Sequence, residues 1–159
     1  MRAVAEAAGT NTPSLYRRFR NRDDILRGLL EHIRLEIAVV IDAATSVEHA
    51  CERYLDYALR HPREYELFYQ HNFRLYHLAP AQTGGAPNRP ARQAMRRKLA
   101  ERLGDSPNGH ERTLLALWML AHGTAMLLID RSILPNEAAQ AKAVFTRSVK
   151  ALLKAADTL

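Results

Sequence analysis

Arginines gathered near the start of this 159-residue sequence are the residues best suited to bind a polyanion. Residues 1–22 contain five arginines and one acid, so a local charge of +4 accounts for most of the +6 of the whole chain. Such an excess favours contact with the phosphate backbone of a nucleic acid. Taken without its context, the same charge pattern equally fits an ordinary solvated surface. The elements that hold these arginines therefore decide between the two interpretations.

The same segment has the pattern of two short helices joined by a tight turn. The alanine-rich stretch 2–8 predicts a helix that ends at Gly9, because the residue after a helix often needs a positive φ. Asn11 or Thr12 is expected to cap a second helix over 13–19, whose first turn accommodates a proline. A helix, a short turn with glycine and a basic helix are typical of a helix-turn-helix.

This segment resembles the DNA-binding motif of the TetR (tetracycline repressor-like) family. The resemblance rests on Ala5, Ala8, Gly9, Leu15, Tyr16 and Phe19, followed by the run Asn-Arg-Asp-Asp-Ile-Leu at 21–26. It implies that the second helix enters the major groove of operator DNA, and that Arg22 contacts a phosphate. The residues it implies for DNA contact are Arg2, Thr12, Pro13, Ser14, Tyr16, Arg17, Arg18 and Arg22.

Members of that family carry one more helix before the position at which this sequence starts. That helix packs across the other two. We therefore expect residues 1–21 to be a partial helix-turn-helix domain, and residues 22–159 to be a helical domain that binds an effector and dimerises. The alternative is an effector-binding helical dimer that does not bind DNA.

The remainder of the chain predicts helices almost throughout, so the expected fold class is all-α: a helix-turn-helix head followed by a helical bundle. Apolar residues at helical spacing predict a long helix from about Arg22 to Ala44, capped by Asn21. In the TetR family this helix joins the head to the body, and its movement re-spaces the two heads of a dimer. The pattern Thr45-x-x-Glu48 predicts the start of the next helix.

Further helices are expected from Pro62, over 91–103, over 111–129 and over 136–156. The pattern Asn108-x-x-Glu111 is the expected start of the third of these. The segment 79–90, rich in proline and glycine, is expected to be a loop. A second basic cluster, at 89–102, is interpreted as a solvated surface.

Several classes of protein are disfavoured by the motifs that the sequence lacks. It has no glycine-rich phosphate loop, no His-Glu-x-x-His and no nucleophile elbow. We therefore expect no enzymatic activity, no cofactor and no metal site. Cys51 is the only cysteine and is expected to be a buried apolar residue of a cytoplasmic protein. No signal peptide and no run of 18 apolar residues is found, so no membrane association is expected.

The motif Trp118-x-x-x-His122-Gly123 lies in the most apolar predicted helix. Trp118 and His122 share a helical face, and Gly123 suggests the close approach of a backbone or a ligand. The motif resembles the WHG type of TetR C-terminal domain, although core packing also explains it. The candidate effector-binding residues are Tyr54, Tyr57, Phe68, Tyr69, Phe73, Trp118, Met119, His122 and Met126. They offer few charged groups, so the expected effector is small and largely apolar.

The last two helices are expected to form a homodimer. The helix over 111–129 is apolar nearly all round, which exceeds the single stripe that a monomer needs. Two such helices from each chain would make a symmetric four-helix bundle. The candidate interface residues on the last helix are Ala141, Val144, Phe145, Ser148 and Leu152. The sequence thus predicts a TetR-like one-component regulator, expected to be a repressor, which binds operator DNA as a dimer and is released by an effector.

Overall fold

The computed structural model describes the backbone of residues 1–77 and 89–156, and the side chains of residues 1–71 and 89–156. The described residues form eight α-helices and one 3-10 turn without any strand, which confirms the predicted all-α class. Most of the predicted loop at 79–90 lies outside the described residues. At its end, Pro90 already belongs to a helix.

The head consists of α1 (Arg2–Ala7) and α2 (Thr12–Arg18). Gly9 has φ of 61°, as predicted for the residue that ends α1. Its amide donates to the Glu6 carbonyl, and the Thr10 amide donates to the Ala5 carbonyl, the bond pattern of a Schellman motif. The Asn11 side chain caps α2 by accepting a bond of 2.8 Å from the Ser14 amide. The two predicted helices and their turn are confirmed.

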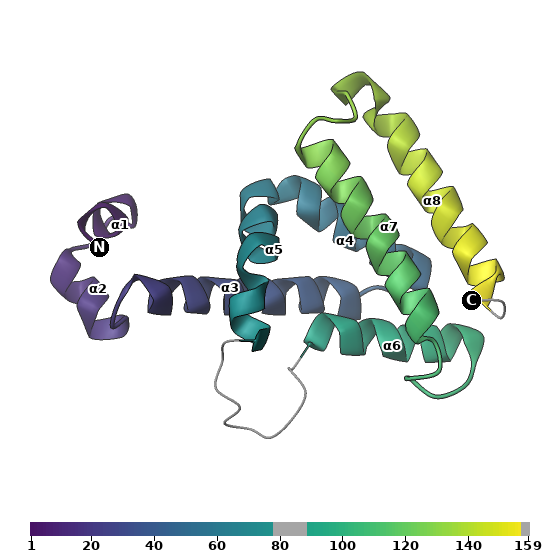
Figure 1. Cartoon of the computed structure of the whole chain (residues 1–159), viewed down its shortest axis with the longest axis horizontal. Coiled ribbons are helices and arrows are strands. Elements are labelled where there is room, and N and C mark those ends of the chain that lie inside the picture. Colours follow the sequence, from purple (N-terminus) through teal and green to yellow (C-terminus); the bar gives the residue numbers. More distant parts are fainter. Residues whose placement is uncertain (78–88, 157–159) are drawn as a thin grey trace.

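A single long helix, α3 (Arg22–Asp42), carries the head at one end and enters the body at the other (Figure 1). Its 21 residues span about 30 Å. The predicted cap at Asn21 is confirmed, since its side chain accepts from the Asp24 amide at 2.9 Å. The apolar stripe from Leu30 to Ile41 is buried among the other helices of the body.

The body packs around the C-terminal half of α3. It consists of α4 (Val47–Arg60), α5 (Pro62–His77), α6 (Pro90–Leu103), α7 (Glu111–Ile129), a 3-10 turn η1 (Pro135–Glu137) and α8 (Ala138–Lys154). Figure 1 shows α5 crossing α3, with α7 and α8 as a neighbouring pair at the far side of the body from the head. One continuous core joins α3 to α8.

Two of the predicted helix caps are wrong by one or two residues. Ser46, and not Thr45, caps α4, because its hydroxyl accepts from the His49 amide at 3.0 Å. The Thr45 hydroxyl lies 3.1 Å from the His49 ring instead. Asn108 does not cap α7, which begins after His110 with no side-chain cap. At α4 two neighbouring hydroxyl residues could serve as the cap, and the backbone geometry selected Ser46.

One side of α7 packs into the core and another faces outward. Leu114, Leu117 and Ala121 are buried, whereas Leu115 is exposed and Met119 is 61% exposed. By length and composition α7 is the one helix in the described part of the chain that could cross a membrane. A helix of the body that has two apolar faces can have the same length and composition as a membrane-spanning helix. The burial of Leu114, Leu117 and Ala121 shows that α7 is a helix of this kind.

We expect Ser46→Ala to lower the free energy of unfolding by about 1 kcal/mol, because the amide of His49 loses its cap. Urea unfolding measures this change. Thr45→Ala is the matched control and should leave stability within a few tenths of a kcal/mol. The reverse ranking of the two variants would contradict the assignment of Ser46 as the cap.

Candidate functional site

A cavity of about 340 Å³ lies inside the body, between α3, α4, α5, α6 and α7. Four of the predicted effector residues line it: Tyr54, Phe68, Tyr69 and Trp118. The other lining residues, which the sequence did not single out, are Arg34, Ile37, Ile41, Cys51, Arg89, Pro90, Ala91, Arg92, Met95, Leu114, Leu117 and Ala121. The site is therefore a largely apolar chamber, of a size that suits a small molecule.

Tyr57, Met119, His122 and Met126 are not among the residues that line this cavity. Tyr57 is buried between α4 and α3, where its hydroxyl donates to the Glu36 carboxylate at 2.9 Å. Met119 is on the outer face of α7, and Met126 packs against another part of the core. The side chain of Phe73 lies outside the described residues. His122 is not a lining residue and is connected to the wall through its hydrogen bond with Tyr65.

Three tyrosine hydroxyls connect the Trp-His pair to the cavity wall. The Trp118 indole N–H donates to the Tyr69 hydroxyl at 3.3 Å. The Tyr69 hydroxyl bonds to that of Tyr54, which lies 2.8 Å from that of Tyr65. The Tyr65 hydroxyl in turn lies 2.8 Å from Nδ1 of His122. Trp118 and His122, the two ring residues of the motif on α7, are thus the two ends of one chain of hydrogen bonds. The tyrosines between them come from α4 and α5.

The direction of this chain depends on His122. An indole can only donate, and each tyrosine has one O–H to donate. If His122 Nδ1 accepts, every bond runs one way, from Trp118 through Tyr69, Tyr54 and Tyr65 to the imidazole. If Nδ1 carries a proton, the tyrosine bonds reverse, and Tyr69 receives two bonds and keeps its own O–H to donate. The chain therefore offers the cavity two different hydrogen-bonding states of Tyr69.

Burial keeps all these groups uncharged near neutral pH. It raises the pKa of Tyr54, Tyr65 and Tyr69, so the phenols stay protonated. Burial also lowers the pKa of His122 below the ordinary value of 6.5, so the imidazole is neutral. The network consequently offers hydrogen bonds to the cavity and carries no charge of its own.

Positive charge in the wall is the feature that the sequence reasoning missed. Arg34 from α3 and Arg89 and Arg92 from the start of α6 line the cavity. The expectation of few charged groups at the site is therefore wrong. A signal was present for Arg34, because it falls on the apolar stripe of α3 between Ile33 and Ile37, where it is buried.

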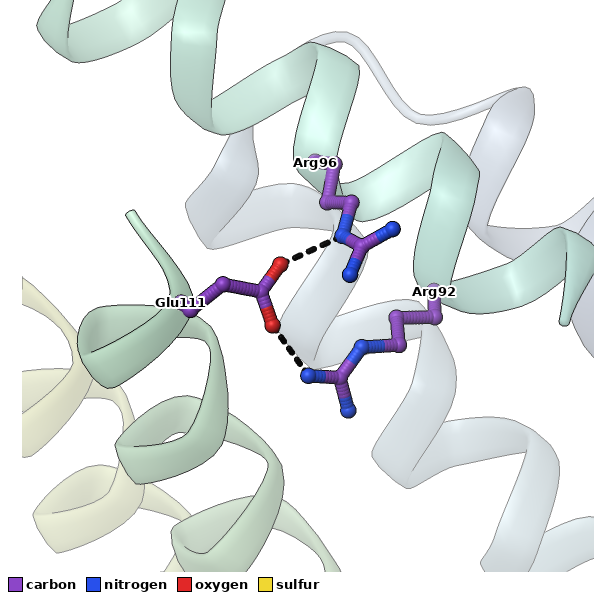
Figure 2. Close-up of polar contacts among 3 residues, drawn as sticks. All are labelled: Arg92, Arg96 and Glu111. Atoms are coloured by element: carbon purple, nitrogen blue, oxygen red, sulfur yellow. Dashed lines mark hydrogen bonds and ion pairs between the residues drawn. The ribbon is translucent and has the colours of Figure 1, made fainter. Parts of the chain in front are cut away.

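The second basic cluster, at 89–102, does more than face solvent. Arg92 and Arg96 both bind the carboxylate of Glu111 at the start of α7 (Figure 2). Arg97 binds the Asp42 carboxylate at 2.7 Å, and Lys98 donates to the Asp42 carbonyl at 3.0 Å. These contacts fasten α6 to the end of α3 and to α7, so the interpretation as a merely solvated surface is wrong.

Cys51 lines the cavity, and its thiol is unreactive. Burial, together with Glu48 and Glu52, raises the pKa of its thiol to about 12. The thiolate is the nucleophilic form of cysteine, so this side chain contributes apolar surface and no reactivity. Its predicted role as a buried apolar residue is confirmed.

Most of the predicted DNA-contacting residues lie on the surface of the head. Arg2, Pro13, Tyr16, Arg17, Arg18 and Arg22 are exposed, and Thr12 and Ser14 are half-buried. Arg17 donates to the Ser14 hydroxyl at 3.0 Å, which holds the two side chains on the same face of α2. Arg22 is the first residue of α3. Their contact with DNA stays a prediction.

The residues predicted for the dimer divide between the core and the surface. Phe145 is 2% exposed and packs inside its own chain, whereas the adjacent Val144 is 45% exposed. Ala141, Ser148 and Leu152 are half-buried. Val144 is therefore at the centre of the outward face of α8, and Phe145 packs in the core.

Among the described residues no other element approaches Gly123 closely, contrary to what the motif suggested. A Cβ atom added there would meet no described atom within 4 Å outside its chain neighbours and the backbone of its own helix. Gly123 lies between Met119 and Leu127, both of them exposed, on the outward stripe of α7. The small residue is thus part of an open apolar surface and not of the cavity.

A helix-turn-helix at one end of a long helix, with a helical body at the other end, is the architecture of a transcriptional regulator. Two family profiles match the chain: bacterial regulatory proteins of the tetR family over residues 1–29, and the tetracyclin repressor-like C-terminal domain over residues 47–152. The chain belongs to the TetR family of transcriptional regulators, which confirms the resemblance. No curated protein and no solved structure matches it significantly.

We expect the free energy of unfolding to decrease as the pH falls from 7 to 5, and to decrease less in His122→Gln. The folded chain disfavours protonation of His122, so the unfolded chain takes up that proton at a higher pH. Stability is therefore lost as the pH falls through 6.5 toward the lowered pKa. Glutamine keeps a hydrogen-bonding group near Tyr65 but cannot titrate. Urea unfolding at several pH values would refute this if both proteins gave the same slope.

Proposed function

We propose that this chain is a cytoplasmic one-component repressor that binds operator DNA as a homodimer and is released by a small effector. The head, residues 1–21, contacts DNA, and the body, residues 22–159, binds the effector and dimerises. The observation that carries the proposal is the dual role of α3. This helix begins with Arg22 at the head and supplies Arg34, Ile37 and Ile41 to the cavity wall.

That dual role supplies a route from effector to DNA. A ligand that displaces the wall residues of α3 moves the helix on which the head is mounted. In a dimer, this changes the spacing of two heads that must fit two half-sites. The effector then acts by a population shift between a DNA-competent and an incompetent state, to the extent of its differential affinity for the two.

The outward faces of α7 and α8 support the proposed dimer. Leu115, Met119 and Leu127 form an exposed apolar stripe on α7, with Gly123 as a gap in its centre. Val144 adds an exposed side chain from α8. A second copy that buries this surface would remove apolar area from water, and the gap at Gly123 would admit its helix closely.

A catalytic role is not part of the proposal, since the family is generally non-enzymatic. Among the side chains of residues 1–71 and 89–156, no three of His, Cys, Asp or Glu gather where they could hold a metal ion. The carboxylates near the cavity, such as Glu31 and Glu111, are held by arginines.

One observation favours the second candidate function, an effector-binding dimer that does not bind DNA. The head buries only two residues, Ala5 and Leu15, and leaves Val4 exposed. So small a core gives the two helices little support of their own. The DNA measurement below discriminates between the two candidates.

We expect the chain to bind a mixed-sequence DNA duplex with a steep dependence on salt concentration. The reason is that Arg17 and Arg18 lie on α2 and Arg22 begins the next helix, all of them exposed. Arg22→Ala should lower the log–log slope of affinity against salt by about 0.9, as for the loss of one phosphate contact. Fluorescence anisotropy at several salt concentrations measures it. Arg63→Ala, a change to an exposed arginine of the body, is the control and should leave the slope unchanged.

An equal slope for the parent and Arg22→Ala would contradict the phosphate contact. The absence of any DNA binding by the parent would favour the second candidate function.

We expect light scattering to give the parent twice the 18.0 kDa of one chain. Gly123→Leu should shift the protein to monomer without loss of folding, because its side chain meets open space in one chain but fills the gap in the dimer. Leucine is also a better helix former than glycine. Gln70→Leu, an added leucine at an exposed site of α5, is the control. A dimeric Gly123→Leu variant would overturn this interface.

A further inference from the structure

We propose that the effector is an amphipathic anion, with an apolar body and one carboxylate-type head. This rests on the proposed function, in which the cavity is the effector site, and specifies the chemistry that the site selects. Among the described residues that line the cavity there are three arginines and no aspartate or glutamate. Most of the remaining lining is aliphatic or aromatic.

The first arginine comes from α3. The side chain of Arg34 is 9% exposed and is held by Glu31 on the same helix, with Nε donating to the carboxylate at 2.7 Å. Glu31 is itself much more exposed and does not line the cavity. Glu31 thus holds the guanidinium from outside the lining, while Arg34 itself belongs to the cavity wall.

The other two arginines come from the first turn of α6. Arg89, Pro90, Ala91 and Arg92 line the cavity in succession, so the positive end of this helix lies at the chamber. The side chain of Arg92 is fixed from outside the lining, by Glu111.

Glu111 does not neutralise this end of the cavity, because it is shared. Figure 2 shows its two carboxylate oxygens bound to different guanidiniums, one from Arg92 and one from Arg96. The hydrogen bond from Arg96 is the main cause that lowers the pKa of Glu111, so the acid is fully ionised. One negative charge faces two positive ones, which leaves an excess of positive charge beside the chamber.

This charge distribution ranks the classes of effector. A carboxylate gains charge-assisted hydrogen bonds from guanidinium groups that are already held in place. A neutral molecule of the same shape gains only the apolar contacts. A cation must enter a chamber whose charged groups repel it. The structure therefore favours anion over neutral molecule over cation, when the apolar body is kept constant.

The test compares three probes that differ only in the head group: decanoate, decan-1-ol and decylamine. Trp118 lines the cavity and is the only tryptophan, so its emission reports on binding at this place. We expect decanoate to bind the full chain about tenfold or more tightly than decan-1-ol, the ratio that hydrogen bonds to a charged group give. Decylamine should bind more weakly than either.

The variant Arg89→Gln/Arg92→Gln should lose most of the preference for decanoate while its affinity for decan-1-ol stays the same. Arg97→Gln/Arg102→Gln is the matched control. It removes the same charge from the same helix, at positions that do not line the cavity, and should keep the preference. Thermal unfolding without probe establishes that both variants are folded.

Each failure has a distinct meaning. If none of the probes changes the emission of Trp118 or raises the melting temperature, the cavity is not an effector site and the proposed function fails. If decan-1-ol or decylamine binds as well as decanoate, the effector site stands and the anionic class is wrong. An equal preference in the two double variants would remove Arg89 and Arg92 from the recognition of the head group.

Discussion

The hydrogen-bonded backbone of α3 is unbroken from Arg22 to Asp42, so its two ends cannot move independently. The head is attached at one end, while the other end forms a wall of the cavity and the middle of the core. The contacts of α6 with Asp42 fasten that second end to the body. Any rearrangement around the cavity therefore either leaves α3 in place or moves the head as well. The proposed coupling of effector to DNA depends on this constraint.

The Trp-His pair on α7 serves the fold and the site together. Tyr65 is fully buried, and a phenol hydroxyl in that position is costly unless it is hydrogen-bonded. His122 supplies that bond from behind the wall, while Trp118 reaches the cavity itself. Core packing and a place in the cavity wall, which the sequence left as alternatives, thus belong to different ends of one network.

Local patterns were enough to predict the fold, and they were less informative about the site. The helix-turn-helix, the turn at Gly9 and the long α3 depend on neighbours in the sequence, and all three are confirmed. Cap positions failed where two polar residues competed, as Thr45 and Ser46 did. The lining of the cavity depends on which faces of five helices meet. Arg89 and Arg92 therefore looked like surface residues, and Met119 looked like a site residue.

The order of functions along α3 also makes the chain divisible. The head precedes α3, which begins at Arg22, and the first residue of α3 that lines the cavity is Arg34. Under the proposed function, a junction placed between these two residues would exchange the DNA-contacting head without changing any residue that lines the chamber. Recombination at this point would then give a chain a new operator and leave its effector unchanged, so the two kinds of recognition could evolve separately.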